Sequence, residues 1–217
     1  MSIFTEVTLS LLEGFGTTLK LFALTLLFSL PLGFLMSLCS MSKCKWLSYI
    51  TKTFIWIIRG TPLMLQILVV FFAPGIIFGT PIFSGHRFEA ALITFVINYS
   101  CYFSEIYRSG IQSIPRGQFE AGLVLGLDKK KIMSKIIAEQ VFRRILPPMS
   151  NEIITLVKDT SLVRVIAVIE IIKAAEKFAS KGLIWPLFYT GVFYLAFSGL
   201  LTLLFGALEK KLSYYKI

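Results

Sequence analysis

The stretch IPRGQFEAGLVLGLDKKKIMSKI, from Ile114 to Ile136, interrupts a chain that is otherwise strongly apolar. The 217-residue sequence is 56% hydrophobic, only 16% charged and contains 20 phenylalanines. This composition is typical of a membrane protein and not of a soluble domain. Within the quoted stretch, by contrast, charged residues crowd together. They are Arg116, Glu120, Asp128, Lys129, Lys130, Lys131 and Lys135.

Five apolar segments around this stretch are candidate membrane spans. A helix needs roughly 20 mostly apolar residues to cross the hydrocarbon core of a bilayer. The candidates are residues 19–38, 54–78, 90–107, 153–172 and 183–208. Lys158, Asp159 and Arg164 interrupt the fourth. We therefore expect an all-α, multi-pass membrane protein in which residues 1–217 form a single five-span domain.

The distribution of basic residues predicts which side each connection faces. Eight Lys and Arg residues lie between Arg108 and Arg144, whereas the preceding connection holds only Arg87. Basic residues near span ends stay on the cytoplasmic side. This places the N-terminus outside, and residues 113–148 and the C-terminus in the cytoplasm. Although the net charge is +10, the charges alternate with the spans, so the pattern argues against a nucleic-acid partner.

The charged stretch itself predicts two helices joined by a turn. Pro115 suits the first turn of a helix, because its missing N–H would be unsatisfied there. Gly126 can close that helix in the left-handed conformation, and Asp128 is a good N-cap for a second helix. We expect Pro147 and Pro148 to end the second helix. From the residues alone, the result could also be a solvated amphipathic hairpin without a partner.

The segment EAGLVLGL, with Glu120, Ala121 and Gly126, resembles the EAA loop of ABC importer permeases, in which Glu-Ala-Ala is followed four residues later by Gly. Other motifs occur around it in a fixed order. They are RGTPLMLQ (Arg59–Gln66), EIYRSGIQSIPRGQFEAG (Glu105–Gly122), FRRILPPMSNE (Phe142–Glu152) and LVKDTSL (Leu156–Leu162). Together they resemble the polar-amino-acid subfamily of these permeases over nearly the whole chain. The resemblance implies the MetI-like, type I importer bundle in a bacterial inner membrane.

The chain departs from the family pattern at two places. Gly122 replaces the usual second Ala, which weakens a helix by roughly 1 kcal/mol but allows closer packing. Where the family usually reads Ile-Leu-Pro-Gln, this chain has Ile137-Ala138-Glu139-Gln140. We expect the second helix to continue unbroken there, because the proline is missing.

The resemblance assigns the charged loop to energy coupling. In the family this loop is a coupling helix that docks on a separate ATPase subunit, so Glu120, Ala121, Gly122 and Gly126 are expected to transmit the ATPase stroke. Gly117 and Gly122 have P-loop spacing, but Leu123-Val124 follow where Lys-Ser/Thr is required. We therefore expect no enzyme activity and no cofactor in this chain, with ATP and magnesium bound by the partner. The implied partners are two ATPase subunits, a second permease, an extracytoplasmic solute-binding protein and an amino acid substrate.

Polar residues inside the third and fourth spans predict the solute path, because charges within a span are costly and usually mark function. Two helical faces carry them. They are Asn98, Tyr102 and Glu105 on one, and Glu152, Thr155 and Asp159 on the other. The expected path residues are Asn98, Glu105, Lys158, Asp159, Thr160 and Ser161. Asp159 and Lys158 could bind the ammonium and carboxylate of an amino acid, or could instead only satisfy one another or anchor an inner gate.

Other motifs are expected to have supporting roles. Arg59, Gly60, Thr61 and Pro62 begin the second span on the cytoplasmic side, where we favour a structural or gating role. The segment from Phe71 to Phe88 and the loop from Lys173 to Lys181 are the surfaces that a substrate-delivering protein would touch.

The sequence leaves alternatives to an amino acid importer open. The transported solute is not readable, and it could be another small molecule such as an opine or a sulfur compound. A passive conduit that needs no ATPase is the rival from another class.

Overall fold

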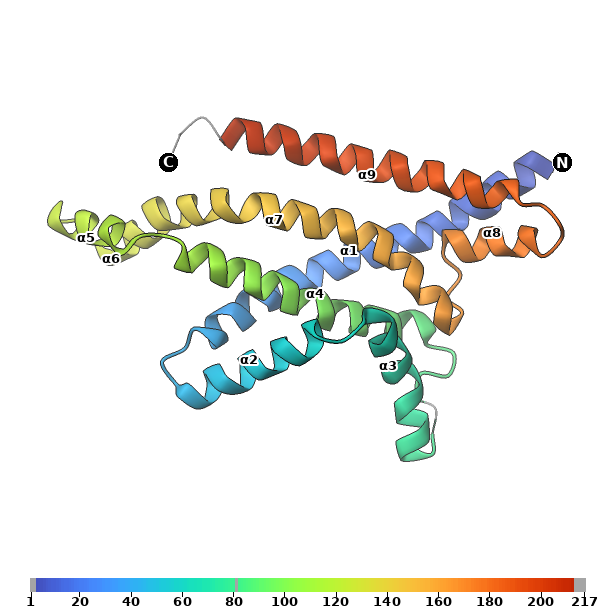
Figure 1. Ribbon diagram of the computed structural model, residues 1–217, viewed down its shortest axis with the longest axis horizontal. Helices are drawn as coiled ribbons and strands as arrows, with labels where there is room; N and C mark the ends of the chain where they lie inside the picture. Colours follow the sequence, from blue (N-terminus) through green and yellow to red (C-terminus); the bar gives the residue numbers. More distant parts are fainter. Residues whose placement is uncertain (1–2, 81, 213–217) are drawn as a thin grey trace.

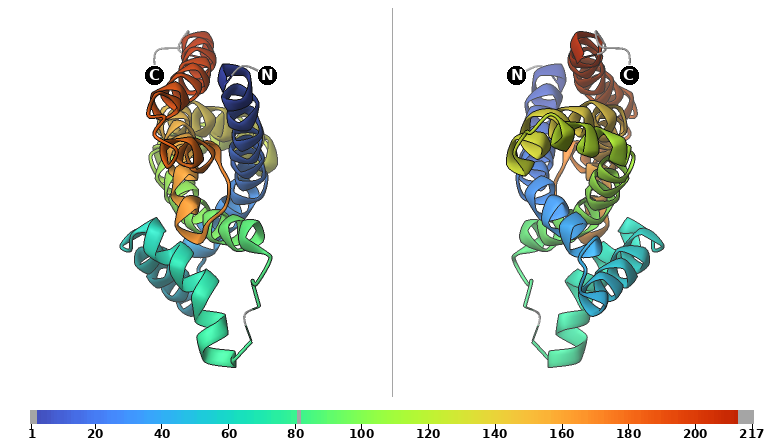
Figure 2. Two further views of the ribbon diagram at one scale, coloured as in Figure 1. Left: turned by 90° about the vertical axis from the view of Figure 1, so that its right-hand side faces the viewer. Right: turned by 90° about the vertical axis from the view of Figure 1, so that its left-hand side faces the viewer.

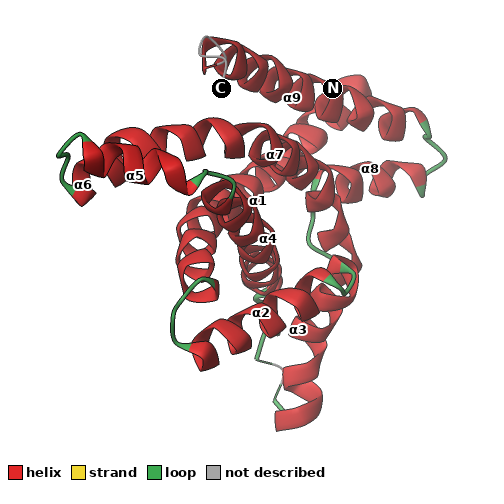
Figure 3. Cartoon of the chain, turned by 60° about the vertical axis from the view of Figure 1, so that its left-hand side comes forward, coloured by secondary structure: helices red, strands yellow, loops and turns green. Residues whose placement is uncertain are grey.

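The computed structural model describes residues 3–80 and 82–212, and within that part it contains helices, turns and loops but no strand (Figures 1 and 3). The helical elements follow one another along the chain. They are α1 (Ile3–Ser40), α2 (Lys45–Arg59), α3 (Leu63–Phe78), α4 (Arg87–Gln112), α5 (Arg116–Val124), α6 (Lys129–Lys131), the π-helical segment η1 (Ile132–Ile137), α7 (Ala138–Asp159), the 3-10 segment η2 (Thr160–Ile166), α8 (Ile171–Ala179) and α9 (Trp185–Leu212).

Four long helices, α1, α4, α7 and α9, run lengthwise through the molecule (Figure 1). The α5–α6 hairpin lies at one end, and α8 and the start of α1 lie at the other. Helix α2 runs beside the bundle, and α3 turns away from it and projects outward (Figure 2). The chain thus brings its charged stretch to one end of a bundle of long apolar helices.

Helix α4 supplies the centre of the hydrophobic core. Its Phe95, Tyr99 and Phe103 are at most 2% exposed and pack ring against ring at four-residue spacing. Leu21 of α1 and Leu156 of α7 pack in the same buried cluster. Helix α1 faces α4 with a stripe of small residues, which lets the two backbones approach closely. The buried members of that stripe include Thr18, Thr25, Ser29, Gly33 and Ser37.

Length and composition identify α1 and α9 as helices able to cross a membrane, and α2 with α3 as a third, broken span bent by 105°. Helices α4 and α7 are 26 and 22 residues long but carry more charged side chains. The expected segments 19–38 and 90–107 lie within α1 and α4, and the expected segment 183–208 begins two residues before α9. The expected segment 54–78 straddles the bend between α2 and α3.

The fourth expected segment, 153–172, is not one helix. Helix α7 ends at Asp159, η2 follows, and Ala167 takes the left-handed conformation with φ 59° before α8 begins. The prediction that Lys173 to Lys181 form a loop is also wrong, because most of that segment belongs to α8. The Glu170 carboxylate starts α8 by accepting hydrogen bonds from the amides of Ile172 and Lys173, at 2.8 and 2.7 Å.

Prolines interrupt the helices less than expected. Pro147 and Pro148 lie inside α7 instead of ending a helix, and Pro74 lies inside α3. The expected outer loop from Phe71 to Phe88 therefore shrinks to the connection after Phe78, and Pro81 of that loop lies outside the described residues. A proline removes one backbone hydrogen bond, but neighbouring helices can compensate when both flanks are packed. In α7 the flanking Ile145, Leu146, Met149 and Ser150 are all buried.

Candidate functional site

The elbow between α2 and α3 is fixed by side chains of the RGTPLMLQ segment. Thr61 Oγ1 donates to the Ile57 carbonyl at 3.0 Å, and Gln66 Nε2 donates to the Ile58 carbonyl at 2.7 Å and to Thr61 Oγ1 at 2.8 Å. These bonds satisfy carbonyl groups that the end of α2 leaves without an intrahelical partner. Hydrogen bonds from residues on both sides of Pro62 therefore fix the angle between α2 and α3.

Asn98 of α4 connects this elbow to the bundle. It is 4% exposed, and its Nδ2 donates to Gln66 Oε1 at 3.0 Å. The amide is thus turned into the protein and engaged with another side chain. Asn98 therefore links α4 to the elbow.

A charged cluster lies where the end of α2 meets α4. Glu105 forms a two-pronged pair with Arg108, at 2.9 Å to Nε and 2.6 Å to Nη2. The Arg59 guanidinium lies 3.7 Å from the same carboxylate and 5.1 Å above the centre of the Tyr102 ring. Glu105 therefore bridges two arginines on two helices, and its side chain is 22% exposed. The face of the Tyr102 ring attracts the Arg59 guanidinium as well, in addition to the attraction by the Glu105 carboxylate.

A second polar contact joins α4 to the end of α7. The Tyr99 hydroxyl donates to Asp159 Oδ2 at 2.7 Å. Sequence reasoning missed Tyr99. The signal was available, because a tyrosine in the buried aromatic row of α4 needs an acceptor for its hydroxyl, and few carboxylates lie in these helices.

The other residues expected along the path separate into exposed and buried groups. Lys158 is exposed and makes no ion pair with Asp159 among the described residues, so the two do not simply satisfy one another. Ser161 is half-buried and donates to the Lys158 carbonyl at 2.8 Å. Thr160 is fully buried and donates to the Val157 carbonyl at 2.6 Å. Thr160 is therefore placed to support the helix end, without a surface that a solute could touch.

The α5–α6 hairpin is closed by glycines at two positions. Gly126 has φ 70°, and its amide and that of Leu127 donate to the carbonyls of Leu123 and Gly122 at 2.9 and 3.0 Å. Gly122 is buried against η1, where a Cβ would lie 2.8 Å from Ile132 Cγ1. The substitution that weakens α5 thus allows the two arms of the hairpin to touch. Asp128 occupies the expected N-cap position, but its side chain makes no capping hydrogen bond.

The hairpin lies at one end of the molecule (Figure 3), and its tip exposes apolar side chains. Val124 is 87% exposed and Leu125 77%, and Glu120 and Ala121 beside them are exposed as well. Phe119, Leu123 and Leu127 are the other large apolar residues of the hairpin that a partner could bury. Of these only Leu123 is exposed, and the other two are half-buried. The spacing of apolar residues in the sequence does not indicate that α5 ends at Val124 or that the Val124 side chain points outward.

The base of the hairpin is attached to both adjoining long helices. Arg144 of α7 donates to the Ser113 carbonyl at the end of α4, and Gln140 Nε2 lies 3.4 Å from Gln118 Oε1 of α5. The helix is continuous through the Ile137–Gln140 segment, which passes from η1 into α7. The hairpin is therefore a projecting element with a fixed base.

The opposite end of the molecule carries a small charged surface on α8. Glu176 pairs with Arg164 at 2.8 Å and with Lys173 at 3.0 Å. The hydrogen bond from Lys173 holds the pKa of the Glu176 carboxyl below its usual value. Among the described residues, no three His, Cys, Asp or Glu side chains lie close enough together to hold a metal ion.

Comparison with known proteins adds independent findings. Residues 29–214 match the family described as binding-protein-dependent transport system inner membrane component. The arginine transport system permease protein ArtQ of Bacillus subtilis (strain 168) is 34% identical over 93% of this chain and 92% of its own length. The L-cystine transport system permease protein TcyB of the same organism is 34% identical over 93% of this chain and 86% of its own. A crystal structure of an amino acid ABC transporter with histidines aligns over 97% of this chain and 100% of its own, with a TM-score of 0.86 and 28% identity.

Proposed function

This chain belongs to the family of binding-protein-dependent transport system inner membrane components, and from this premise we propose that it is the membrane-spanning permease subunit of an ATP-driven amino acid importer. The protein crosses a bacterial cell membrane and forms the path along which the solute moves. A separate ATPase supplies the energy, and ATP and magnesium bind there, so this chain is not itself an enzyme.

The observation that carries the proposal is the exposed apolar tip of the α5–α6 hairpin. Val124 and Leu125 protrude at 87% and 77% exposure from a fixed base. Apolar side chains exposed at the end of a rigid projection and rimmed by charges are typical of a docking surface. Glu120 lies beside them and can accept a hydrogen bond from a partner's arginine or backbone amide. Ala121 and Gly126 leave room for the partner's backbone.

The solute path follows the polar side chains on α2, α4 and α7. The broken span at the elbow resembles the interrupted helices that form solute sites in transporters. The charged groups along this path are Glu105 with Arg59, and Asp159 with Lys158. Side chains of both signs suit a zwitterionic amino acid, whose ammonium group needs an anion and whose carboxylate needs a donor.

The complete transporter contains more chains than this one. The path is completed by a second permease, which is either another copy or a homologous chain, and two ATPase subunits dock on the two hairpins. An extracytoplasmic solute-binding protein delivers the solute to the end that carries α8. In this arrangement the N-terminus is outside and the C-terminus is cytoplasmic, as the basic residues near the hairpin favour.

More than one solute is compatible with these features, because the two relatives described above carry arginine and cystine in their names. A permease for another small solute, such as an opine or a sulfur compound, is the second candidate; the cystine relative is named for a solute that is both an amino acid and a sulfur compound. Binding of a panel of amino acids to the purified complex, measured as a rise in melting temperature, distinguishes these solutes.

Co-purification tests the proposed coupling and separates an importer from an ATPase-independent conduit. The permease is co-expressed with its ATPase, and the ATPase retained on the tagged permease is measured. The double variant Val124→Asp/Leu125→Asp should lose the ATPase, because it places charges on the docking surface without touching a buried residue. Ile184→Asp is the matched control, since Ile184 is 62% exposed at the opposite end. An ATPase retained equally by both variants, or absent from the wild type, would overturn the proposal.

A further inference from the structure

Two hollows lie along helices α1 and α4 and carry opposite kinds of lining. The first, of about 550 Å³, is lined by apolar side chains. They include Phe28, Leu32 and Leu35 of α1 and Leu92, Ile93 and Val96 of α4. The second, of about 570 Å³, lies nearer the start of α4. Its charged lining residues are Lys20, Arg87 and Glu89, and the rest of its lining is Thr17, Gly85, Phe88, Val168 and Ile169.

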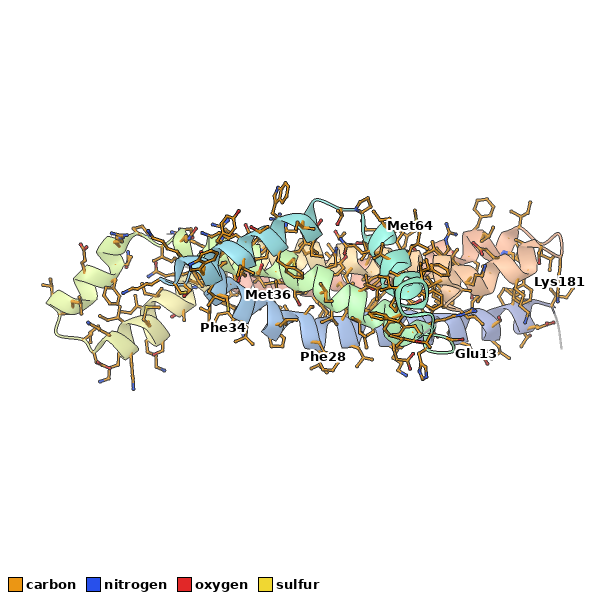
Figure 4. The ribbon with its side chains drawn as sticks, turned by 90° about the horizontal axis from the view of Figure 1, so that it is seen from below. Glu13, Phe28, Phe34, Met36, Met64 and Lys181 are labelled. Atoms are coloured by element: carbon orange, nitrogen blue, oxygen red, sulfur yellow. The ribbon has the colours of Figure 1, made fainter. Side chains whose placement is uncertain are left out.

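The two hollows follow one another along the same two helices, and we treat them as one groove with a polar end. On α1, the lining residues 17, 20, 28, 31 and 35 recur at helical spacing and share one face. On α4, the lining passes from Glu89 directly to Leu92 and Ile93. Phe28 lies on the outer edge of α1, where no other described segment covers it (Figure 4). Phe28, Leu35 and Ile93 remain 49%, 56% and 44% exposed.

The polar end of the groove carries two cations and one carboxylate. Lys20 Nζ extends from α1 across to α4, 5.1 Å above the centre of the Phe88 ring. Among the described residues, neither the Lys20 ammonium nor the Arg87 guanidinium makes an ion pair or a hydrogen bond. The carboxylate of Glu89 lies 3.6 Å from His86 Nδ1 and also interacts electrostatically with Lys20. Two cations against one carboxylate leave a net positive charge for an occupant with a negative group.

We propose that this groove binds one glycerophospholipid, with an acyl chain between α1 and α4 and the phosphate between Lys20 and Arg87. A phospholipid combines an apolar acyl chain with an adjacent phosphate. The groove likewise has an apolar part next to a positively charged part. An apolar protein helix packed here would bury the two cations with only Glu89 to balance them, and burial of unbalanced charge is costly. With the topology proposed above, the lipid belongs to the outer leaflet. Binding here is separate from transport and coupling, because it uses none of their residues.

Native mass spectrometry of the intact transporter tests the proposal. The detergent-purified complex is titrated with phosphatidylglycerol, and in parallel with diacylglycerol, which has the same acyl chains but lacks the phosphate. We expect phosphatidylglycerol to bind and diacylglycerol to bind more weakly. In Lys20→Gln/Arg87→Gln, binding of phosphatidylglycerol should weaken by about tenfold to thirtyfold, because each basic side chain contributes to attraction for an anionic headgroup. Lys177→Gln/Lys181→Gln, which removes two exposed lysines of the same end outside the groove, should bind as the wild type does.

Three results would overturn the lipid site. One is equal binding of phosphatidylglycerol by the wild type and the Lys20→Gln/Arg87→Gln variant. Another is equal binding of phosphatidylglycerol and diacylglycerol by the wild type. This comparison does not depend on whether a variant folds. The third is the absence of bound lipid from the assembled transporter, as expected if a second permease covers the groove. Both substituted side chains are exposed, so the melting temperature without lipid should be unchanged and serves as the control for folding.

Discussion

Replacing Gly14 by alanine measures how closely α1 packs against the start of α8. A Cβ at this position would lie 2.9 Å from Ile171 Cα and 3.0 Å from the Glu170 carbonyl oxygen. Non-bonded carbon atoms normally approach to about 3.5–4.0 Å. Both neighbouring atoms belong to the backbone, so rotation of a side chain cannot relieve the overlap. The start of α8 must therefore move away from α1. This movement falls at Glu170, whose carboxylate caps α8.

The expected change in the free energy of unfolding for Gly14→Ala is the sum of two opposing effects. Overpacking a close contact costs about 1–3 kcal/mol, whereas alanine in place of glycine stabilises a helix interior by about 1 kcal/mol. Gly16 lies on the same helix two residues later, and no atom of another described segment lies within 4 Å of the position that a Cβ would take there. Gly16→Ala therefore gains the helix term alone. The difference between the two variants isolates the contact, about 1–3 kcal/mol in favour of Gly16→Ala.

Thermal unfolding of the two variants in the same detergent and at the same heating rate gives the comparison. For a protein of this size, 1 kcal/mol corresponds to about 2–4 °C in melting temperature. Gly14→Ala should therefore melt about 2–12 °C below Gly16→Ala. If Gly14→Ala melts at or above Gly16→Ala, α1 and α8 are not packed backbone to backbone, and the reasoning fails.

Three further predictions concern the path and the hairpin. Tyr99→Phe should lower stability by about 1–3 kcal/mol in thermal unfolding, because it removes a hydrogen bond to a carboxylate; Tyr102→Phe, whose hydroxyl makes no hydrogen bond among the described residues, should not. Asp159→Asn should weaken substrate binding and transport in proteoliposomes, and unchanged affinity and rate would exclude contact between Asp159 and the solute. Gly122→Leu should reduce transport and ATPase retention by forcing the hairpin arms apart, whereas Gly117→Leu, at an open position on the same helix, should retain both.

Much of the fold follows from features that are local in the sequence. Apolar length identified the segments now found in α1, α4 and α9, and the left-handed turn at Gly126 follows from the conformational freedom of glycine. The all-helical fold and the family were both predicted correctly from ordered motifs. These signals succeed because each can be read along the sequence without knowing how distant segments pack.

The remainder depends on contacts between distant segments. Pro147 and Pro148 indicate a helix end when only neighbours in sequence are considered, but packing on both flanks keeps α7 intact. Helix α8 was missed because its start depends on Glu170, a buried carboxylate that looks like part of an apolar span. Tyr99 and Asp159 are 60 residues apart in sequence, and only the fold brings them to 2.7 Å.

The contacts also determine how force at the hairpin would reach the path. Arg144 attaches the hairpin base to both α4 and α7, and these two helices meet again at the bond between Tyr99 and Asp159. The elbow moves with α4 because Gln66 holds Asn98. A displacement of the docked hairpin, as the proposed function requires, therefore moves both sides of the path together unless one of these contacts breaks. The weakest of these interactions is the ion pair between Arg59 and Glu105, because it is partly exposed and solvent competes with it. We therefore expect the elbow charges, more than the buried hydrogen bonds, to exchange partners during transport.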